Sequence, residues 1–269
     1  MAPEIQLEGR VAVVTGCSRP NGIGRAIALA LGEAGAAVGV IARSDGGHPD
    51  DVLEALADQI SKQGGEAVAV RGDVGSGPDV ARMVGDIEDA LGGIDILVNN
   101  AAVAHGADRG PTWEVSEEAF DEVFRVNTKG VFLMSTEVVR RMLDRGVTSG
   151  RIVNIGSGVA RRGMPNRAAY SASKAAVLNL TQSMATELGP RGITVNTVNP
   201  GWIRTDRANP GGFEKMQDAS RGSGFGFAVP LDRVGNPADI ASVVAFLVGS
   251  GADYITGQAI NVDGGQMMT

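Results

Sequence analysis

The sequence predicts an α/β protein with one doubly wound domain, in which helices cover both faces of a mainly parallel sheet of about seven strands. Two observations support this prediction. Short apolar runs rich in valine and isoleucine recur along the whole chain, and segments with helical periodicity alternate with them. Regular alternation of strand and helix is typical of βαβ units. Runs that are apolar almost throughout suit strands that are buried on both faces.

The expected strands are residues 11–14, 38–41, 67–70, 94–98, 152–155, 193–198 and 259–262. Between them, apolar side chains recur at three- and four-residue spacing, as expected of helices that pack on a sheet. Glycines follow the first three helices, and Gly189 with Pro190 ends a helix expected over residues 168–188. No linker divides the chain, so we expect one domain over residues 1–269, with residues 202–235 as a lid over a ligand site.

Composition and charge exclude several classes of function. Asp and Glu outnumber Lys and Arg by 31 to 24, which gives a net charge of −7 and argues against nucleic-acid or anionic-membrane partners. A single cysteine, Cys17, excludes a disulfide within the chain, and with only His48 and His105 we expect no metal site. No apolar run approaches the ~18 residues that cross a bilayer, and residues 1–10 lack a signal-peptide core. We therefore expect a cytoplasmic protein.

A glycine-rich loop, residues 15–24, follows the first expected strand and opens the first helix. Glycines let a backbone approach a pyrophosphate, and a helix N-terminus offers free N–H groups and a partial positive charge. The loop departs from the strict G-x-G-x-x-G pattern because Ile27 occupies the third glycine position. A tight turn without a ligand is the alternative. The candidate dinucleotide contacts are Gly16, Ser18, Arg19, Asn21, Gly22, Ile23 and Gly24.

Four polar residues form a candidate catalytic group. Tyr170 and Lys174 lie four residues apart in an expected helix, so the phenol and the ammonium project from one face. A tyrosine transfers protons poorly near pH 7 unless a nearby cation stabilises its phenolate, because its reference pKa is near 10. Ser157 follows an expected strand at its carboxyl end, where open α/β sheets place their sites. Asn127 lies inside a helical segment. Because asparagine is a mediocre helix former, we expect a side chain at this position either to be exposed to solvent or to serve a function.

The glycine loop and these four residues, in this order and spacing, resemble the short-chain dehydrogenase/reductase family in its classical form of one Rossmann-like domain. The resemblance implies that Tyr170 is the general acid in reduction and the base in oxidation, while Ser157 holds the carbonyl or alcohol oxygen. It implies that Lys174 lowers the tyrosine pKa and binds the nicotinamide ribose. Asn127 would support a proton path to Lys174 through water. The chain departs from the family by a longer glycine loop.

Three further segments match the family in order. Asp73 and Val74 resemble its adenine-contacting segment, and residues 99–102 resemble its Asn-Asn-Ala-Gly motif, with alanine in place of the glycine. Residues 199–201 and Thr205 resemble its nicotinamide-binding segment. The resemblance adds these cofactor contacts: Asp73, Val74, Asn100, Ala101, Ala102, Pro200, Gly201, Ile203 and Thr205, together with Tyr170 and Lys174.

The end of the second strand bears on the choice of nicotinamide cofactor. Ala42 occupies the position where NAD enzymes usually present a carboxylate to the adenosine ribose. Arg43 follows, beside Ser44, and can pair with a 2′-phosphate, with Arg19 as a second contact. Asp45 is the competing observation, because it could serve a ribose. We therefore expect NADP(H), with NAD(H) as the alternative.

The substrate is the least specified part of the prediction. Resemblance to 3-oxoacyl carrier-protein reductases and related carbonyl reductases implies reduction of a 3-oxo ester, a thioester or another ketone. The alternatives are NAD-dependent oxidation of a secondary alcohol, polyol or steroid, and a cofactor-binding regulator without turnover. The family is also expected to form homotetramers. The candidate substrate contacts are Ser157, Val159, Met164, Tyr170 and Trp202; nearby, Arg161, Arg162 and Arg167 form either a solvated rim or a contact for an anionic carrier.

Overall fold

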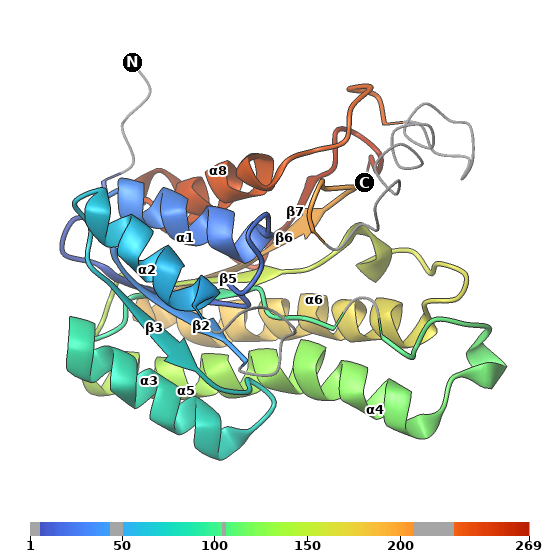
Figure 1. Cartoon of the computed structure of the whole chain (residues 1–269), viewed down its shortest axis with the longest axis horizontal. Coiled ribbons are helices and arrows are strands. Elements are labelled where there is room, and N and C mark those ends of the chain that lie inside the picture. Colours follow the sequence, from blue (N-terminus) through green and yellow to red (C-terminus); the bar gives the residue numbers. More distant parts are fainter. Residues whose placement is uncertain (1–5, 44–50, 104–105, 207–228, 269) are drawn as a thin grey trace.

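The structure is a computed structural model that describes residues 6–43, 51–103, 106–206 and 229–268. At its centre lies a seven-stranded sheet in the order β3-β2-β1-β4-β5-β6-β7, with every neighbouring pair parallel (Figure 1). This confirms the doubly wound α/β fold, and the strand ends lie within two residues of the expected ones. The strands are β1 (Val11–Thr15), β2 (Ala37–Ala42), β3 (Ala67–Arg71), β4 (Ile96–Asn99), β5 (Arg151–Ile155), β6 (Thr194–Pro200) and β7 (Ala259–Val262).

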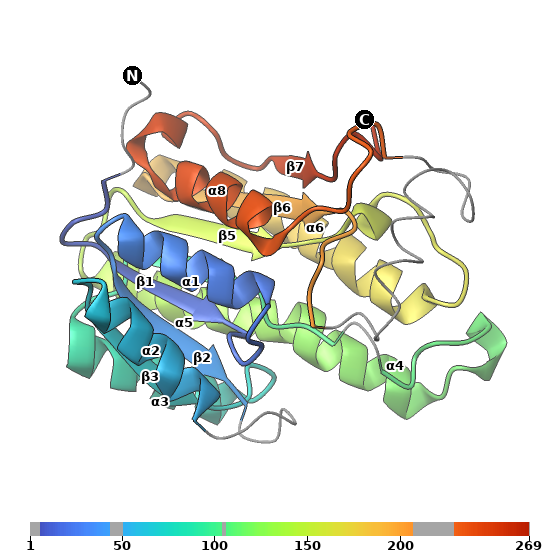
Figure 2. The same ribbon diagram turned by 45° about the horizontal axis from the view of Figure 1, so that its top comes forward.

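Helices cover both faces of the sheet, as expected. The first, second and last helices pack on one face, and α3, α5 and α6 pack on the other (Figure 2). The α-helices are α1 (Ile23–Glu33), α2 (Val52–Lys62), α3 (Gly77–Leu91), α4 (Glu117–Phe124), α5 (Gly130–Asp144), α6 (Ala168–Leu188) and α8 (Pro237–Val248). Short 3-10 turns are Thr112–Glu114, Gly158–Ala160, Gly189–Arg191 and Ser250–Ala252.

Strand β1 shows why the strands are apolar almost throughout. Ala12 and Val14 belong to the core between the sheet and α1, α2 and α8. Val11 and Val13 belong to the core between the sheet and α3, α5 and α6. All four side chains are at most 6% exposed. A strand buried on both faces leaves no position for a solvated side chain, so continuous rather than alternating hydrophobicity is the correct signal here.

Helices α4 and α5 are joined by a π-helical turn, Arg125–Lys129, that the sequence did not predict. Ser116 caps the beginning of α4, where its Oγ accepts a hydrogen bond of 3.2 Å from the Ala119 N–H. The helical segment that contains Asn127 therefore begins directly after Ser116. The π-turn widens the helix at the position of Asn127, one of the candidate catalytic residues.

A buried polar chain crosses the middle of the sheet. Asn99 on β4 donates to Asn154 Oδ1 on β5 at 2.9 Å, and Asn154 Nδ2 donates to Thr181 Oγ1 on α6 at 2.8 Å. Asn99 also donates to Ser135 Oγ on α5 at 3.0 Å, and Thr181 bonds to Thr197 on β6 at 2.8 Å. Each member is at most 3% exposed. These bonds fix three strands and two helices relative to one another.

The sheet order reverses between β1 and β4, because β2 and β3 extend to one side of β1 and the later strands to the other. In open α/β sheets, ligands bind in the crevice at the carboxyl ends of the strands on either side of such a reversal. No helix of the described residues is long and apolar enough to cross a membrane. Among the same residues, no group of three or more His, Cys, Asp or Glu side chains could hold a metal ion.

Candidate active site

The glycine loop lies at the reversal point, against the loop that follows β4. Gly16 has a φ of +76°, and a Cβ there would lie 2.8 Å from Ala101 Cα. A Cβ on Gly24 would lie 2.6 Å from Gly16 O. Asn100 Nδ2 holds the two loops together by donating to Thr15 O at 2.8 Å and to Gly16 O at 3.0 Å. Side chains at either glycine would therefore force these segments apart.

The N-terminus of α1 suits an anion. Gly22 is its N-cap and supplies no side-chain hydrogen bond, and the first turn carries no acidic residue. The N–H groups of such a turn lack intrahelical partners, and the helix dipole favours a negative charge there. Asn21, an expected cofactor contact, also ties the loop to the segment after β6. Its N–H donates to Asp206 Oδ2 at 2.6 Å, and its Nδ2 donates to Arg204 O at 3.2 Å.

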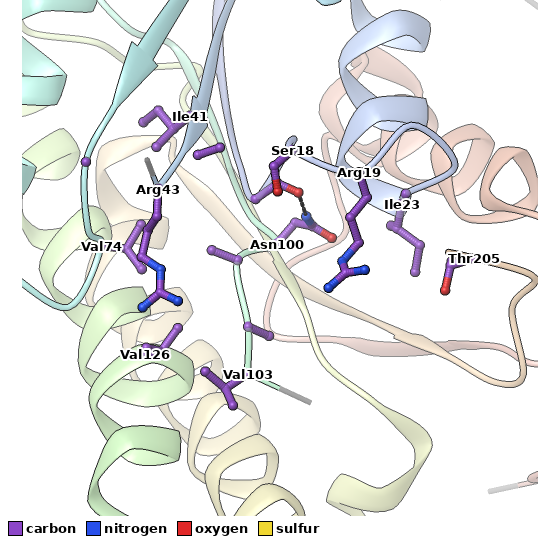
Figure 3. Close-up of a pocket in the computed structure, with 16 residues that line it drawn as sticks. Ser18, Arg19, Ile23, Ile41, Arg43, Val74, Asn100, Val103, Val126 and Thr205 are labelled. Carbon is purple, nitrogen blue, oxygen red and sulfur yellow. Dashed lines mark hydrogen bonds between the residues drawn. The ribbon is translucent and has the colours of Figure 1, made fainter. Parts of the chain in front are cut away.

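One cleft, of about 210 Å³, brings most of the expected cofactor contacts together (Figure 3). It runs from Arg43 at the end of β2 to Thr205 beyond β6. The expected contacts that line it are Gly16, Ser18, Arg19, Gly22, Ile23, Arg43, Val74, Asn100, Ala101, Ala102 and Thr205. The lining also includes five residues that were not among the expected contacts, each within two residues of an expected contact or catalytic residue: Ile41, Ala42, Gly72, Val103 and Val126. Asn21, Gly24, Asp73, Pro200, Gly201, Ile203, Tyr170 and Lys174 are not among the lining residues, and Ser44 lies outside the described residues.

Charged side chains cluster at the end of this cleft that Arg43 lines. Arg43 Nη1 lies 3.6 Å from Glu122 Oε1 on α4. Arg125 donates to the same carboxylate at 2.7 and 3.0 Å and to Asp73 Oδ2 at 2.7 Å. Burial by itself would raise the pKa of Asp73, but hydrogen bonds from the Gly75 N–H and Arg125 hold that pKa below its ordinary value. Sequence reasoning missed Glu122 and Arg125, whose three-residue spacing on a helix is common on any surface.

Lys174, Tyr170 and Ser157 lie near the carboxyl end of β5. Lys174 is 3% exposed, and its Nζ donates to Ile155 O at 2.7 Å. The same Nζ lies 6.0 Å from the centroid of the Tyr170 ring. Ser157 is half-buried, and its N–H donates to Asn199 Oδ1 at 3.1 Å. The structure thus positions an ammonium beside the phenol, and a serine hydroxyl two residues beyond Ile155.

Asn127 is fully buried at the π-turn, and its side chain bonds to protein on both sides. Its Oδ1 accepts from the Val103 N–H at 2.7 Å, and its Nδ2 donates to Val103 O at 2.9 Å and to Ser173 Oγ at 3.1 Å. Ser173 Oγ in turn donates to Tyr170 O at 2.8 Å. The amide therefore ties the loop after β4 to the catalytic turn of α6. Its expected part in a proton path through water stays a prediction.

A second cation lies over the phenol of Tyr170. The Arg167 Cζ is 5.8 Å from the ring centroid, and the side chain is half-buried, whereas Arg161 and Arg162 are exposed. Burial and the nearby Arg109 lower the pKa of Arg167, and attraction from Tyr170 and Asp108 opposes that shift. Of the three arginines at the expected rim, Arg167 is therefore the one that lies over the ring of Tyr170.

The expected substrate contacts are distributed over more than one surface. Val159 and Met164 are half-buried and follow Ser157 in the chain. Trp202 lines a second cleft, between the start of α8 and the end of β7. Residues 207–228 of the expected lid lie outside the described residues. Met267 was not among the expected contacts, and its Sδ would lie 3.4 Å from a Cβ on Gly158, next to Ser157.

Comparison with known proteins gives consistent results. Residues 16–267 match the family described as enoyl-(acyl carrier protein) reductase. Versicolorin reductase 1 of Aspergillus parasiticus is 38% identical, and the alignment covers 98% of this chain and 99% of that protein. A 3-oxoacyl-(acyl-carrier-protein) reductase of Staphylococcus epidermidis is 39% identical over 96% of this chain and 98% of the relative.

Two solved structures extend this likeness to the fold. A putative short-chain alcohol dehydrogenase of Sinorhizobium meliloti is 37% identical and superposes with a TM-score of 0.87, with 98% of each chain covered. A blue fluorescent protein from a metagenomic library, solved in complex with NADPH, is 35% identical, with a TM-score of 0.87 and coverage of 98% of this chain and 100% of that one.

Proposed function

The chain belongs to the short-chain dehydrogenase/reductase family, and we propose that it reduces the ketone of a 3-oxo ester, a thioester or a related compound with NADPH. It is an oxidoreductase that acts on carbonyl or alcohol groups, as its relatives do. The observation that carries the proposal is the juxtaposition of Tyr170 and Lys174 at the carboxyl end of β5, on the sheet whose glycine loop and Arg43 line one cleft.

The residues of the cleft fit a phosphorylated dinucleotide. The uncapped N-terminus of α1 would hold the pyrophosphate, and Arg43 would pair with a 2′-phosphate at the other end. Thr205 and the segment after β6 would hold the nicotinamide. When bound, that ring supplies the hydride. The relative solved with NADPH and the named reductase relatives support this choice of cofactor.

Tyr170 would deliver the proton that completes reduction. The phenol gives its proton to the substrate oxygen, and the phenolate that forms is stabilised by the adjacent Lys174 ammonium. Lys174 is 3% exposed and donates a hydrogen bond to Ile155 O, so its charge is held in place and poorly screened by water. An ammonium has three donors, and Lys174 would also bond to a ribose hydroxyl. Ser157 would hold the substrate oxygen in reach of the phenol.

Steady-state assays with a panel of ketones, 3-oxo esters, acyl thioesters and steroids test this function. We expect NADPH consumption with at least one 3-oxo ester or thioester, faster than with NADH at equal concentration. Arg43→Ala should raise the KM for NADPH about tenfold with little change in kcat, since a charge-assisted phosphate contact contributes ~1.5–3 kcal/mol. Faster turnover with NADH, or an unchanged KM for NADPH in Arg43→Ala, would contradict the choice of cofactor.

A cytoplasmic location and a homotetramer belong to the same proposal. Their support is the single cysteine and the family membership. Sedimentation equilibrium of the purified chain tests the tetramer: a mass of about four chains is expected, and a monomer at micromolar concentration would contradict it.

A further inference from the structure

Four charged side chains form a continuous network at the end of the cleft that Arg43 lines, where the adenosine of the cofactor would bind. Arg43 follows β2, Glu122 lies on α4, Arg125 begins the π-turn and Asp73 follows β3. Glu122 is the shared partner: one of its oxygens lies 3.6 Å from Arg43, and Arg125 binds both of its oxygens at 2.7 and 3.0 Å. Arg125 also forms an ion pair with Asp73, with 2.7 Å between Nη1 and Oδ2.

The two arginines of this network differ in how firmly they are held. Arg125 has two carboxylate partners in hydrogen bonds of 2.7 to 3.0 Å, and its guanidinium packs against Gly75, where a Cβ would meet it. Arg43 is held less firmly to Glu122, since its side chain is 38% exposed and its Nη1 lies 3.6 Å from the carboxylate. A stronger anion can therefore draw Arg43 away from Glu122 without disturbing Arg125.

We propose that Glu122 competes with the 2′-phosphate of the cofactor for Arg43, and so limits the preference of this enzyme for NADPH over NADH. The inference rests on the proposed function, because it requires that Arg43 reads the phosphate. A phosphate dianion on Arg43 would lie beside the Glu122 carboxylate and be repelled by it. NADH has a neutral hydroxyl in the same place, so the carboxylate acts on NADPH alone.

The variant Glu122→Gln removes the charge and keeps the shape of the side chain. Arg125 retains Asp73 at 2.7 Å, so the fold around the cleft should persist. Glu118→Gln is a matched control, since it makes the same change of net charge one turn earlier on α4, on the same exposed groove. An exposed ion pair is worth up to ~1 kcal/mol, so its removal should change binding by roughly threefold to fivefold.

Dissociation constants for NADPH and NADH, measured by nicotinamide fluorescence, test the proposal directly. We expect Glu122→Gln to bind NADPH about threefold to fivefold more tightly and NADH unchanged, with the gain shrinking as salt is raised. Glu118→Gln should bind both cofactors as the unaltered chain does. In the Arg43→Ala background, Glu122→Gln should give a smaller gain, because it then relieves only the direct repulsion of the phosphate and releases no arginine from an ion pair.

The same measurements separate the possible failures. Unchanged or weaker NADPH binding in Glu122→Gln, beside a clear loss in Arg43→Ala, would overturn the competition while leaving the proposed cofactor intact. An equal gain in Glu118→Gln or in the Arg43→Ala background would also overturn it, since the effect would then be one of general charge. If Arg43→Ala binds NADPH as tightly as the unaltered chain, the proposed reading of the phosphate and the competition both fail.

Discussion

Replacement of Asn127 by alanine tests whether this asparagine holds the catalytic helix to the cofactor loop. Its amide makes three hydrogen bonds, two to the backbone of Val103 and one to Ser173 Oγ, and the side chain is fully buried. Asn127→Ala removes all three. It also leaves the N–H and C=O of Val103 without these partners in a half-buried position.

The expected loss of stability follows from those contacts. A typical hydrogen bond contributes ~1 kcal/mol net, and a buried polar group left unsatisfied costs ~1–3 kcal/mol. Partial access of water to Val103 and the remaining bond from Ser173 to Tyr170 O reduce the total, which we place at about 3–5 kcal/mol. At ~2–4 °C per kcal/mol for a chain of this size, Tm should fall by about 10 °C.

Urea unfolding followed by circular dichroism, together with thermal melting, measures this loss. Asn179→Ala is the control, because Asn179 is exposed on the same helix as Tyr170 and its replacement should change the free energy of unfolding by less than ~0.5 kcal/mol. A free energy of unfolding for Asn127→Ala within 1 kcal/mol of the unaltered chain would refute the positioning role of this amide.

Three further outcomes are expected. Asn154→Ala should lower the free energy of unfolding by ~2–5 kcal/mol in urea, because it breaks a fully buried polar chain; a loss below 1 kcal/mol would contradict this. The hydrogen bond from Arg233 holds the pKa of Asp239 below its value in the unfolded chain. The ionised Asp239 therefore stabilises the folded state above about pH 4, and this stabilisation is lost as the pH falls through the folded pKa. The stability gap between the unaltered chain and Asp239→Asn, ~1 kcal/mol at pH 7, should therefore close in acid, and a constant gap would refute this. Burial raises the pKa of Cys17 to about 12, so iodoacetamide at pH 8 should label it only after unfolding, and rapid labelling of the folded chain would contradict its burial.

The sequence predicted the fold closely because its signals are local. The expected strands are short runs rich in valine and isoleucine, and α6 (Ala168–Leu188) begins and ends at the expected residues. Tyr170 and Lys174 could be paired in advance because their spacing on one helix fixes which way they project. The glycine loop was recognisable for the same reason, since strand, turn and helix follow one another in the chain.

What the sequence could not predict depends on contacts between distant segments. The π-turn at Arg125–Lys129 accompanies the bonding of Asn127 to Val103, a residue 24 positions away. Arg125 and Asp73 are 52 residues apart in the sequence, and Met267 and Gly158 are more than 100 residues apart. Helical periodicity depends on neighbouring residues and does not predict contacts between distant segments. These features therefore become visible only in the folded structure, where the sheet brings the segments together.

Tyr170→Phe shows whether Tyr170 donates the proton in the reduction. The substitution removes the phenolic oxygen and leaves the ring, whose centroid lies within 6.0 Å of Lys174 Nζ and of Arg167 Cζ. With a 3-oxo ester that the unaltered chain reduces, kcat of Tyr170→Phe should fall by about 10²–10⁴-fold, while the dissociation constant for NADPH stays within about twofold. Reduction at an undiminished rate by Tyr170→Phe, with cofactor binding intact, would contradict the account.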